Sequence, residues 1–181
     1  MIKRFIPILC LVLTVVATHA LGRGSPEAPL ETVPHVDLPR YLGKWYEIAR
    51  YENSFQRDCY GTTATYSLRE DGDIRVVNRC FMGSLEGEVD EAIGRAWVTD
   101  AETNAKLKVR FFWPFSGRYW IIDLGDDYEF AVVGEPSRKY LWILARTPHL
   151  APEVYAEILN RLIQSGYDPK RLLVTEHKKH P

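Results

Sequence analysis

The feature of this sequence that most limits its fold is a series of eight short strand-like runs joined by short links. The predicted strands cover residues 44–51, 60–69, 74–81, 92–99, 106–112, 119–124, 128–133 and 140–145. They are rich in aromatic, aliphatic and β-branched residues and recur about every ten residues, with turn-forming residues between them. We therefore expect eight sequential antiparallel strands connected largely by hairpins.

Two of these runs show clear alternation. Asp71-Gly72 between two strand-like runs is a strong hairpin signal, and the return strand 74–81 places Ile74, Val76, Asn78 and Cys80 on one face. In the run 106–112, three basic residues alternate with Leu107, Val109 and Phe111. One face of that strand is therefore expected to meet solvent and the other a core.

A single long helical pattern follows the strands. Pro152 suits a first helical position, Glu153 favours the positive end of the helix dipole, and Gly166 ends the pattern. Between them lies an apolar stripe at helical spacing, formed by Tyr155, Ile158, Leu159 and Leu162. We expect this helix to lie on a sheet, and a short run at 172–175 to add an edge strand.

Eight antiparallel strands can close into a barrel, which removes exposed edges and leaves room for packed side chains or one small ligand. A sandwich is the alternative, because its strands have a similar spacing. The pattern favours the barrel. The predicted fold class is all-β with one C-terminal helix.

The ends of the chain are expected to lie outside this domain. Residues 1–20 are typical of a secretory signal peptide, with Lys3 and Arg4 before an apolar stretch of about 13 residues, shorter than the roughly 20 that a bilayer span needs. Residues 21–37 form an extended leader with three prolines, and Pro39 follows it; the leader either wraps onto the domain or remains loose. Residues 38–177 form the domain and 178–181 a tail. Cys10 lies inside the apolar stretch and is not expected to be lipidated.

Removal of the signal peptide leaves Cys59 and Cys80, which fall near the same end of one predicted hairpin. An even pair in an exported chain predicts a disulfide, although two independent buried thiols remain the alternative. No metal site is predicted, because no histidine lies near either cysteine and the histidines are scattered.

Composition excludes several classes of function. The chain has 46% hydrophobic residues, a net charge of −1 and no basic run before Lys178-Lys179, so nucleic acid is not an expected partner. There is no G-x-S-x-G, H-E-x-x-H, P-loop or nucleotide-binding fingerprint. Asp126 and Asp127 form an adjacent acidic pair, but after Gly125 they are more typical of a solvated turn. We predict no catalytic residues and no cofactor.

Three short motifs in order carry a family resemblance: Gly43-Lys44-Trp45, Asp126-Asp127-Tyr128 and Arg146. Together with the stretches 40–50, 63–69 and 140–148, they resemble the lipocalins, in particular the bacterial subgroup related to apolipoprotein D. The likeness covers about residues 38–177. Asp126 replaces the family's threonine, and the signal cysteine of the outer-membrane members is missing.

The resemblance implies an eight-stranded up-and-down β-barrel with a closed end and an open end. Trp45 would plug the closed end beneath Arg146, in a cation–π contact worth about 0.5 to 2 kcal/mol. The residues with this structural role are Gly43, Trp45, Asp127, Tyr128 and Arg146. The open end would be the functional site, storing or transporting fatty acids or (lyso)phospholipids in the periplasm, with association with the outer membrane left open.

Alternation along the strands supplies candidate ligand-binding residues: Leu107, Val109, Phe111, Tyr119, Ile121, Tyr140, Trp142 and Leu144. Parity alone does not decide which face of the last two strands points inward, and ordinary core packing is the alternative for each aromatic residue. Phe112, Trp113 and Phe115 stand where a strand should end. If exposed, they form a membrane interface, a ligand portal or a homodimer contact; if buried, they fill the mouth.

Three classes of function therefore remain: a binding protein for lipids, a lipocalin-like enzyme acting on a lipophilic substrate, and an envelope protein that docks a partner through its aromatic rim. Acyl lipids that copurify with the protein would favour the first class.

Overall fold

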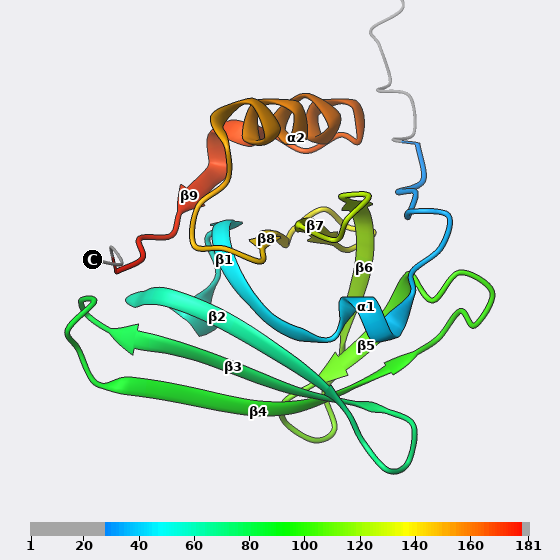
Figure 1. Cartoon of the computed structure of the whole chain (residues 1–181), viewed down its shortest axis with the longest axis horizontal. Helices are drawn as coiled ribbons and strands as arrows, with labels where there is room; N and C mark the ends of the chain where they lie inside the picture. The colour runs from blue at the N-terminus through cyan, green and yellow to red at the C-terminus, as the bar shows by residue number, and fades with distance from the viewer. Residues whose placement is uncertain (1–27, 179–181) are drawn as a thin grey trace, which may run out of the picture.

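All eight predicted strands form and close into a barrel, as the computed structural model of residues 28–178 shows (Figure 1). The strands are β1 (Gly43–Tyr51), β2 (Cys59–Leu68), β3 (Ile74–Met82), β4 (Val89–Val98), β5 (Lys106–Arg110), β6 (Gly117–Leu124), β7 (Phe130–Gly134) and β8 (Leu141–Ala145). The barrel is confirmed over the sandwich. The predicted signal peptide, residues 21–27 of the leader and residues 179–181 of the tail lie outside the described residues.

The barrel closes because β1 pairs with both β2 and β8. Its first half is antiparallel to β2, from Gly43 opposite Tyr66 to Tyr46 opposite Thr63. Its second half leaves β2 and pairs with β9 (Leu172–Val174), the predicted final strand. Beyond β9, the Gly61 N–H donates to the Glu176 carbonyl. The C-terminal segment therefore lies between β1 and β2 where these two strands separate.

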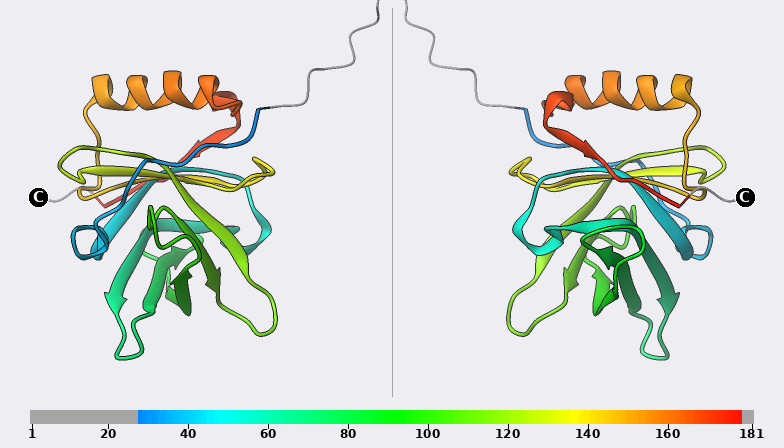
Figure 2. Two further views of the ribbon diagram at one scale, coloured as in Figure 1. Left: turned by 90° about the vertical axis from the view of Figure 1, so that its right-hand side faces the viewer. Right: turned by 90° about the vertical axis from the view of Figure 1, so that its left-hand side faces the viewer.

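Helix α2 (Pro152–Gln164) covers the outside of the barrel, as predicted (Figure 2). Ile158 and Leu162 are buried with the outward-facing residues of β1, β7 and β8. This contact explains why both faces of β7 are buried and why its sequence shows no alternation. On β8 the helix covers Leu141 and Ile143, so Trp142 and Leu144 point inward.

Three shorter helices were not predicted: α1 (Leu38–Tyr41) and the 3-10 turns η1 (Ser54–Gln56) and η2 (Pro169–Arg171). None is long enough to show a helical period in the sequence. Helix α1 does carry local signals, because the Asp37 side chain caps the Arg40 N–H and Pro39 stands in its first turn.

The described part of the leader wraps onto the barrel. Leu30 joins the core beneath α2, whereas Val36 joins the cluster inside the barrel. The Val33 N–H donates to the Ile121 carbonyl, which fixes the path of the chain along β6. The predicted disulfide between Cys59 and Cys80 is confirmed and links β2 to β3, with the two Cα atoms 5.4 Å apart.

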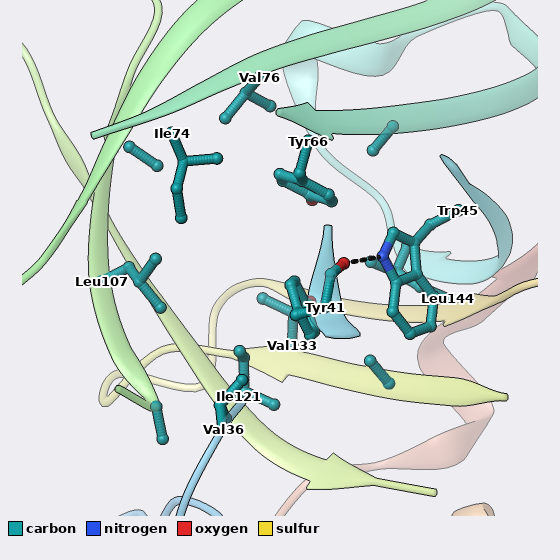
Figure 3. Packing of buried hydrophobic residues seen from close by; sticks show 14 of the residues in the cluster. Val36, Tyr41, Trp45, Tyr66, Ile74, Val76, Leu107, Ile121, Val133 and Leu144 are labelled. Carbon is teal, nitrogen blue, oxygen red and sulfur yellow. Dashed lines mark hydrogen bonds between the residues drawn. The ribbon is translucent and has the colours of Figure 1, made fainter. Parts of the chain in front are cut away.

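One end of the barrel is closed by Trp45 and Arg146. The Trp45 side chain is fully buried, and its Nε1–H donates to the Tyr41 carbonyl at 2.8 Å (Figure 3). The Arg146 guanidinium lies 3.7 Å from the centre of the Trp45 ring. It also donates to the main-chain carbonyls of Arg40, Tyr41, Leu42, Lys44 and Tyr128. One side chain thus joins α1, β1 and the turn before β7.

We expect Trp45→Ala to lower the free energy of unfolding by about 3–5 kcal/mol, because truncation of a buried aromatic leaves a cavity. Urea unfolding measures this loss. Trp97→Ala is the control, since the Trp97 ring also lies beside an arginine, Arg110, but is only partly buried. A loss below about 1 kcal/mol for Trp45→Ala would contradict the role of this ring in closing the barrel.

Candidate functional site

Seven of the eight predicted ligand-binding residues point into the barrel. Leu107, Ile121 and Leu144 are buried members of the interior cluster (Figure 3). Four others pack against that cluster and stay partly exposed: Val109, Phe111, Tyr119 and Trp142. The structure thus brings these seven side chains onto one inner wall, and their contact with a ligand stays a prediction.

Tyr140 is the exception, because it precedes β8 and does not belong to the inner wall. Its side chain is 39% exposed. The ring stacks on Trp142 with 6.0 Å between centroids and lies 5.7 Å from the ring of Phe55. The sequence prediction for Tyr140 extends the alternation of β8 one residue beyond the start of the strand at Leu141. It lies instead at the rim of the barrel.

Three tyrosines meet in the barrel, and two of them, Tyr41 and Tyr66, were not predicted as site residues. The Tyr119 hydroxyl lies 2.6 Å from that of Tyr41 and 2.9 Å from that of Tyr66. Burial raises the pKa of Tyr66 to about 12 and also raises the pKa values of Tyr41 and Tyr119. All three hydroxyls therefore stay protonated near neutral pH, and the two hydrogen bonds among them use two of their three O–H donors.

These tyrosines border a small apolar cavity of about 10 Å³, which has room for roughly one water molecule. Its other lining residues come from β3, β4 and β5: Ile74, Val76, Ala96, Leu107 and Val109. The cavity is too small for a long acyl chain. A ligand of that size must displace side chains or extend beyond this cavity.

The open end, here called the mouth, is the end at which the links β1–β2, β3–β4, β5–β6 and β7–β8 lie. A β-bulge in β1 brings Glu47 and Arg50 to the same side of the strand, because the pairing with β8 shifts between Glu47 and Ala49. Both side chains are buried, and Arg50 Nη1 lies 3.6 Å from Glu47 Oε1. Regular alternation would have placed them on opposite faces, so the sequence did not predict this pair.

Two side chains hold the Glu47 carboxylate, one from the nearby link and one from the C-terminal segment. Its Oε1 accepts from Thr175 Oγ1 at 2.6 Å, and its Oε2 accepts from Gln56 Nε2 at 2.7 Å. Burial raises the pKa of Glu47, although these hydrogen bonds and Arg50 oppose the shift. The mouth therefore contains a buried carboxyl group that gains a proton more readily than an exposed glutamate.

Gln56 connects this pair to β8, the strand that pairs with the second half of β1. Its Oε1 accepts from Trp142 Nε1 at 2.8 Å and from Asn53 Nδ2 at 3.0 Å. Its main-chain carbonyl accepts from Arg50 Nη2 at 2.9 Å. We call Glu47, Arg50, Asn53, Gln56 and Trp142 the mouth cluster. The sequence offered no sign of Gln56, which lies in a link without periodicity.

The predicted aromatic rim is exposed. Phe112, Trp113 and Phe115 are 76%, 83% and 77% exposed in the link between β5 and β6. Phe55, in the β1–β2 link at the same end, is 63% exposed. The alternative in which these aromatics fill the mouth is therefore wrong. These exposed aromatics lie in two of the links at the mouth, the end at which a ligand would reach the inner wall.

The sequence also raised an acidic pair and a metal site. Asp126 and Asp127 are exposed in the turn between β6 and β7. Between residues 28 and 178, no three His, Cys, Asp or Glu side chains are grouped so that they could hold a metal ion. No helix in this part of the chain has the length and apolar character to cross a membrane.

The chain is similar to known proteins both in sequence and in fold. Residues 36–177 match the lipocalin-like domain family. The chain is 39% identical over 170 residues to outer membrane lipoprotein Blc of Escherichia coli K12, which covers 94% of this chain and 96% of that protein. It is 30% identical over 193 residues to apolipoprotein D of Bos taurus, covering 97% and 98%. Insecticyanin from the tobacco hornworm Manduca sexta has the same fold, with a TM-score of 0.68 at 18% identity over 83% of this chain and 85% of its own.

The raised pKa of Glu47 predicts a specific pH dependence. Because the folded chain holds this proton to a higher pH than the unfolded chain, the stability contributed by Glu47 falls as pH rises from 4.5 through its raised pKa. Glu47→Gln cannot titrate, so its free energy of unfolding relative to wild type should increase over that range. Urea unfolding at several pH values measures this difference. A difference that does not change with pH would contradict the assignment.

Proposed function

The chain belongs to the lipocalin family, and from this premise we propose that it binds small hydrophobic ligands inside its barrel and stores or transports them. Fatty acids and lysophospholipids are the proposed ligand class. The similarity to outer membrane lipoprotein Blc places the proposed activity in the cell envelope, in the periplasm or at the outer membrane.

The observation that carries this proposal is the inner wall, which is apolar on β5, β6 and β8 and leads from the mouth to a sealed floor. An acyl chain gains about 25 cal/mol for each Å² of apolar surface removed from water, so this wall can hold it without a specific hydrogen bond. Leu107, Ile121 and Leu144 are rigid strand residues that present such surface. The floor of Trp45 and Arg146 prevents the ligand from passing through the barrel.

Binding rather than catalysis is the proposed activity. The ionisable groups of the mouth are arranged around a glutamine, and the exposed acidic pair 126–127 lies in a turn between β6 and β7, outside the inner wall. No nucleophile with an adjacent base was found in the sequence motifs. A lipid extract of the purified protein, analysed by mass spectrometry, should contain acyl lipids; turnover of an added lipid would instead favour an enzyme.

The exposed aromatic rim supports a second role, contact with a membrane surface from which the ligand is collected. Aromatic side chains suit the boundary between lipid headgroups and acyl chains, where one part of the ring is apolar and another is wet. The rim lies at the same end as the mouth, so a protein resting on the membrane through this patch would present its opening to the lipid. Docking to a protein partner or a second copy of the chain is the competing use of the patch.

Filling the inner wall should abolish ligand binding. We expect Val109→Trp to weaken binding of dodecanoic acid at least tenfold, because the larger side chain takes the space bordered by Leu107 and Tyr119. Isothermal titration calorimetry measures the affinity. Lys108→Trp is the matched control, since Lys108 is exposed on the outer face of the same strand. Unchanged affinity of a folded Val109→Trp variant would place the ligand elsewhere.

Removing the rim aromatics should reduce membrane contact without loss of stability. The triple variant Phe112→Ser, Trp113→Ser and Phe115→Ser should cosediment less with phosphatidylethanolamine–phosphatidylglycerol vesicles, with a nearly unchanged Tm because the three side chains are exposed. The control triple variant changes exposed apolar residues away from the mouth: Leu68→Ser, Ile93→Ser and Ile163→Ser. Equal cosedimentation of the two variants would rule out the membrane role of the rim.

A further inference from the structure

Gln56 makes contacts that a ligand's head group would be expected to make. Its carboxamide oxygen accepts from Trp142 and Asn53, and its carboxamide nitrogen donates to Glu47. The side chain comes from η1, a single turn in the link between β1 and β2, and not from a strand of the barrel wall. The polar groups of the mouth are thus bound to one residue on a connecting segment.

The same region has more polar groups than the protein itself satisfies. Four buried side-chain atoms have no hydrogen-bond partner in the described part of the chain: Arg50 Nε, Asn53 Oδ1, Thr62 Oγ1 and Asn78 Oδ1. They belong to β1, β2, β3 and the link that carries Gln56. Buried polar atoms are normally paired. Two of the four, Arg50 Nε and Asn53 Oδ1, belong to residues that contact Gln56, so they indicate a place where a polar guest can be accommodated.

We propose that Gln56 occupies the head-group site of the barrel, and that the ligand for which it substitutes is an acyl chain ending in a carboxylic acid or a primary amide. The inference rests on the proposed function and names the chemistry that the mouth recognises. A carboxyl group has the same planar shape as the glutamine carboxamide. Its carbonyl oxygen accepts from Trp142 Nε1 and Asn53 Nδ2, and its O–H donates to Glu47 in place of Gln56 Nε2.

Glu47 decides between ligand classes. An ester or a hydrocarbon has no donor to replace the Gln56 N–H, and displacing Gln56 would leave this carboxylate with Thr175 and Arg50 only. Such a ligand is therefore expected to lie in the barrel with Gln56 still in place. A fully ionised fatty acid would place a second negative charge against it, whereas one proton shared between the two carboxyl groups removes that repulsion. A primary amide makes the same hydrogen bonds without a shared proton, because its N–H donates to Glu47 as Gln56 does. The mouth cluster is therefore expected to prefer acids and amides over esters of equal chain length.

The position of Gln56 allows this exchange. Phe55 beside it packs against the rings of Tyr140 and Trp142 at the rim, and Ser54 is exposed. Movement of η1 would withdraw Gln56 without breaking the pairing of a barrel strand. The ligand's alkyl chain would then extend from Trp142, which packs against the interior cluster, toward Leu107 and Val109 at the cavity.

The test compares dodecanamide, dodecanoic acid and methyl dodecanoate by isothermal titration calorimetry with the full chain. Wild type should bind the amide and the acid more tightly than the ester. Gln56→Ala removes the internal competitor, so it should tighten binding of the amide and the acid roughly three- to tenfold and leave the ester within about twofold. Gln164→Ala, a change of the same type at an exposed position of α2, should alter none of the three.

The ranking of the three ligands by wild type tests the site without any variant. A second variant then tests the donor itself. Trp142→Phe, made in the Gln56→Ala background so that no internal group uses the same donor, keeps an aromatic ring and should weaken amide binding several-fold relative to Gln56→Ala alone. Equal affinities of wild type for the three ligands, or an amide affinity unaffected by both variants, would overturn the head-group site and leave the proposed function standing. Failure of all three ligands to bind would overturn both.

Discussion

The contact between Arg146 and Trp45 is the interaction on which the rest of the barrel depends. A closed sheet has two ends, and a single guanidinium over an indole seals one of them, at 3.7 Å from the ring centre. The same guanidinium binds main-chain carbonyls of α1 and β1 that would otherwise be unsatisfied. Because this end is sealed by strong and directional contacts, ligand chemistry is confined to the other end.

The mouth differs from the closed end because charged groups are buried there, and burial carries a desolvation cost. Glu47 and Arg50 are nearly inaccessible, and several atoms around them lack partners. Such groups contribute little net stability, because the desolvation of each charge offsets much of their attraction. The proposed recognition of a ligand gives these buried groups a role. A ligand that displaces Gln56 would find two donors, Asn53 and Trp142, and one acceptor, the Glu47 carboxylate held by Thr175.

Between floor and mouth, the structure combines a tight interior with an opening that carries aromatic residues. The cavity beside Tyr66 and Tyr119 has room for roughly one water molecule, so a long-chain ligand must displace side chains or extend beyond it. The exposed aromatics of the rim lie at that entrance. Helix α2 and Leu30 of the leader pack against the outside of the barrel, whereas Val36 packs inside it.

The sequence by itself determined the strands, the outer helix, the disulfide and the inward face of β5, because hairpin turns and a half-solvated strand leave local patterns that are readable residue by residue. It did not determine the inward face of β8 or the true place of Tyr140, since a strand covered on both sides has no alternation and its ends are not marked. The sequence also did not predict the polar groups of the mouth. A bulge in β1 reverses the alternation, so that Glu47 and Arg50 share one face, and Gln56 reaches Glu47 from a link that has no periodicity. Tertiary structure decided the mouth cluster, because Trp142 of β8 reaches Gln56 only when the barrel has closed, and Thr175 of the C-terminal segment then holds the Glu47 carboxylate.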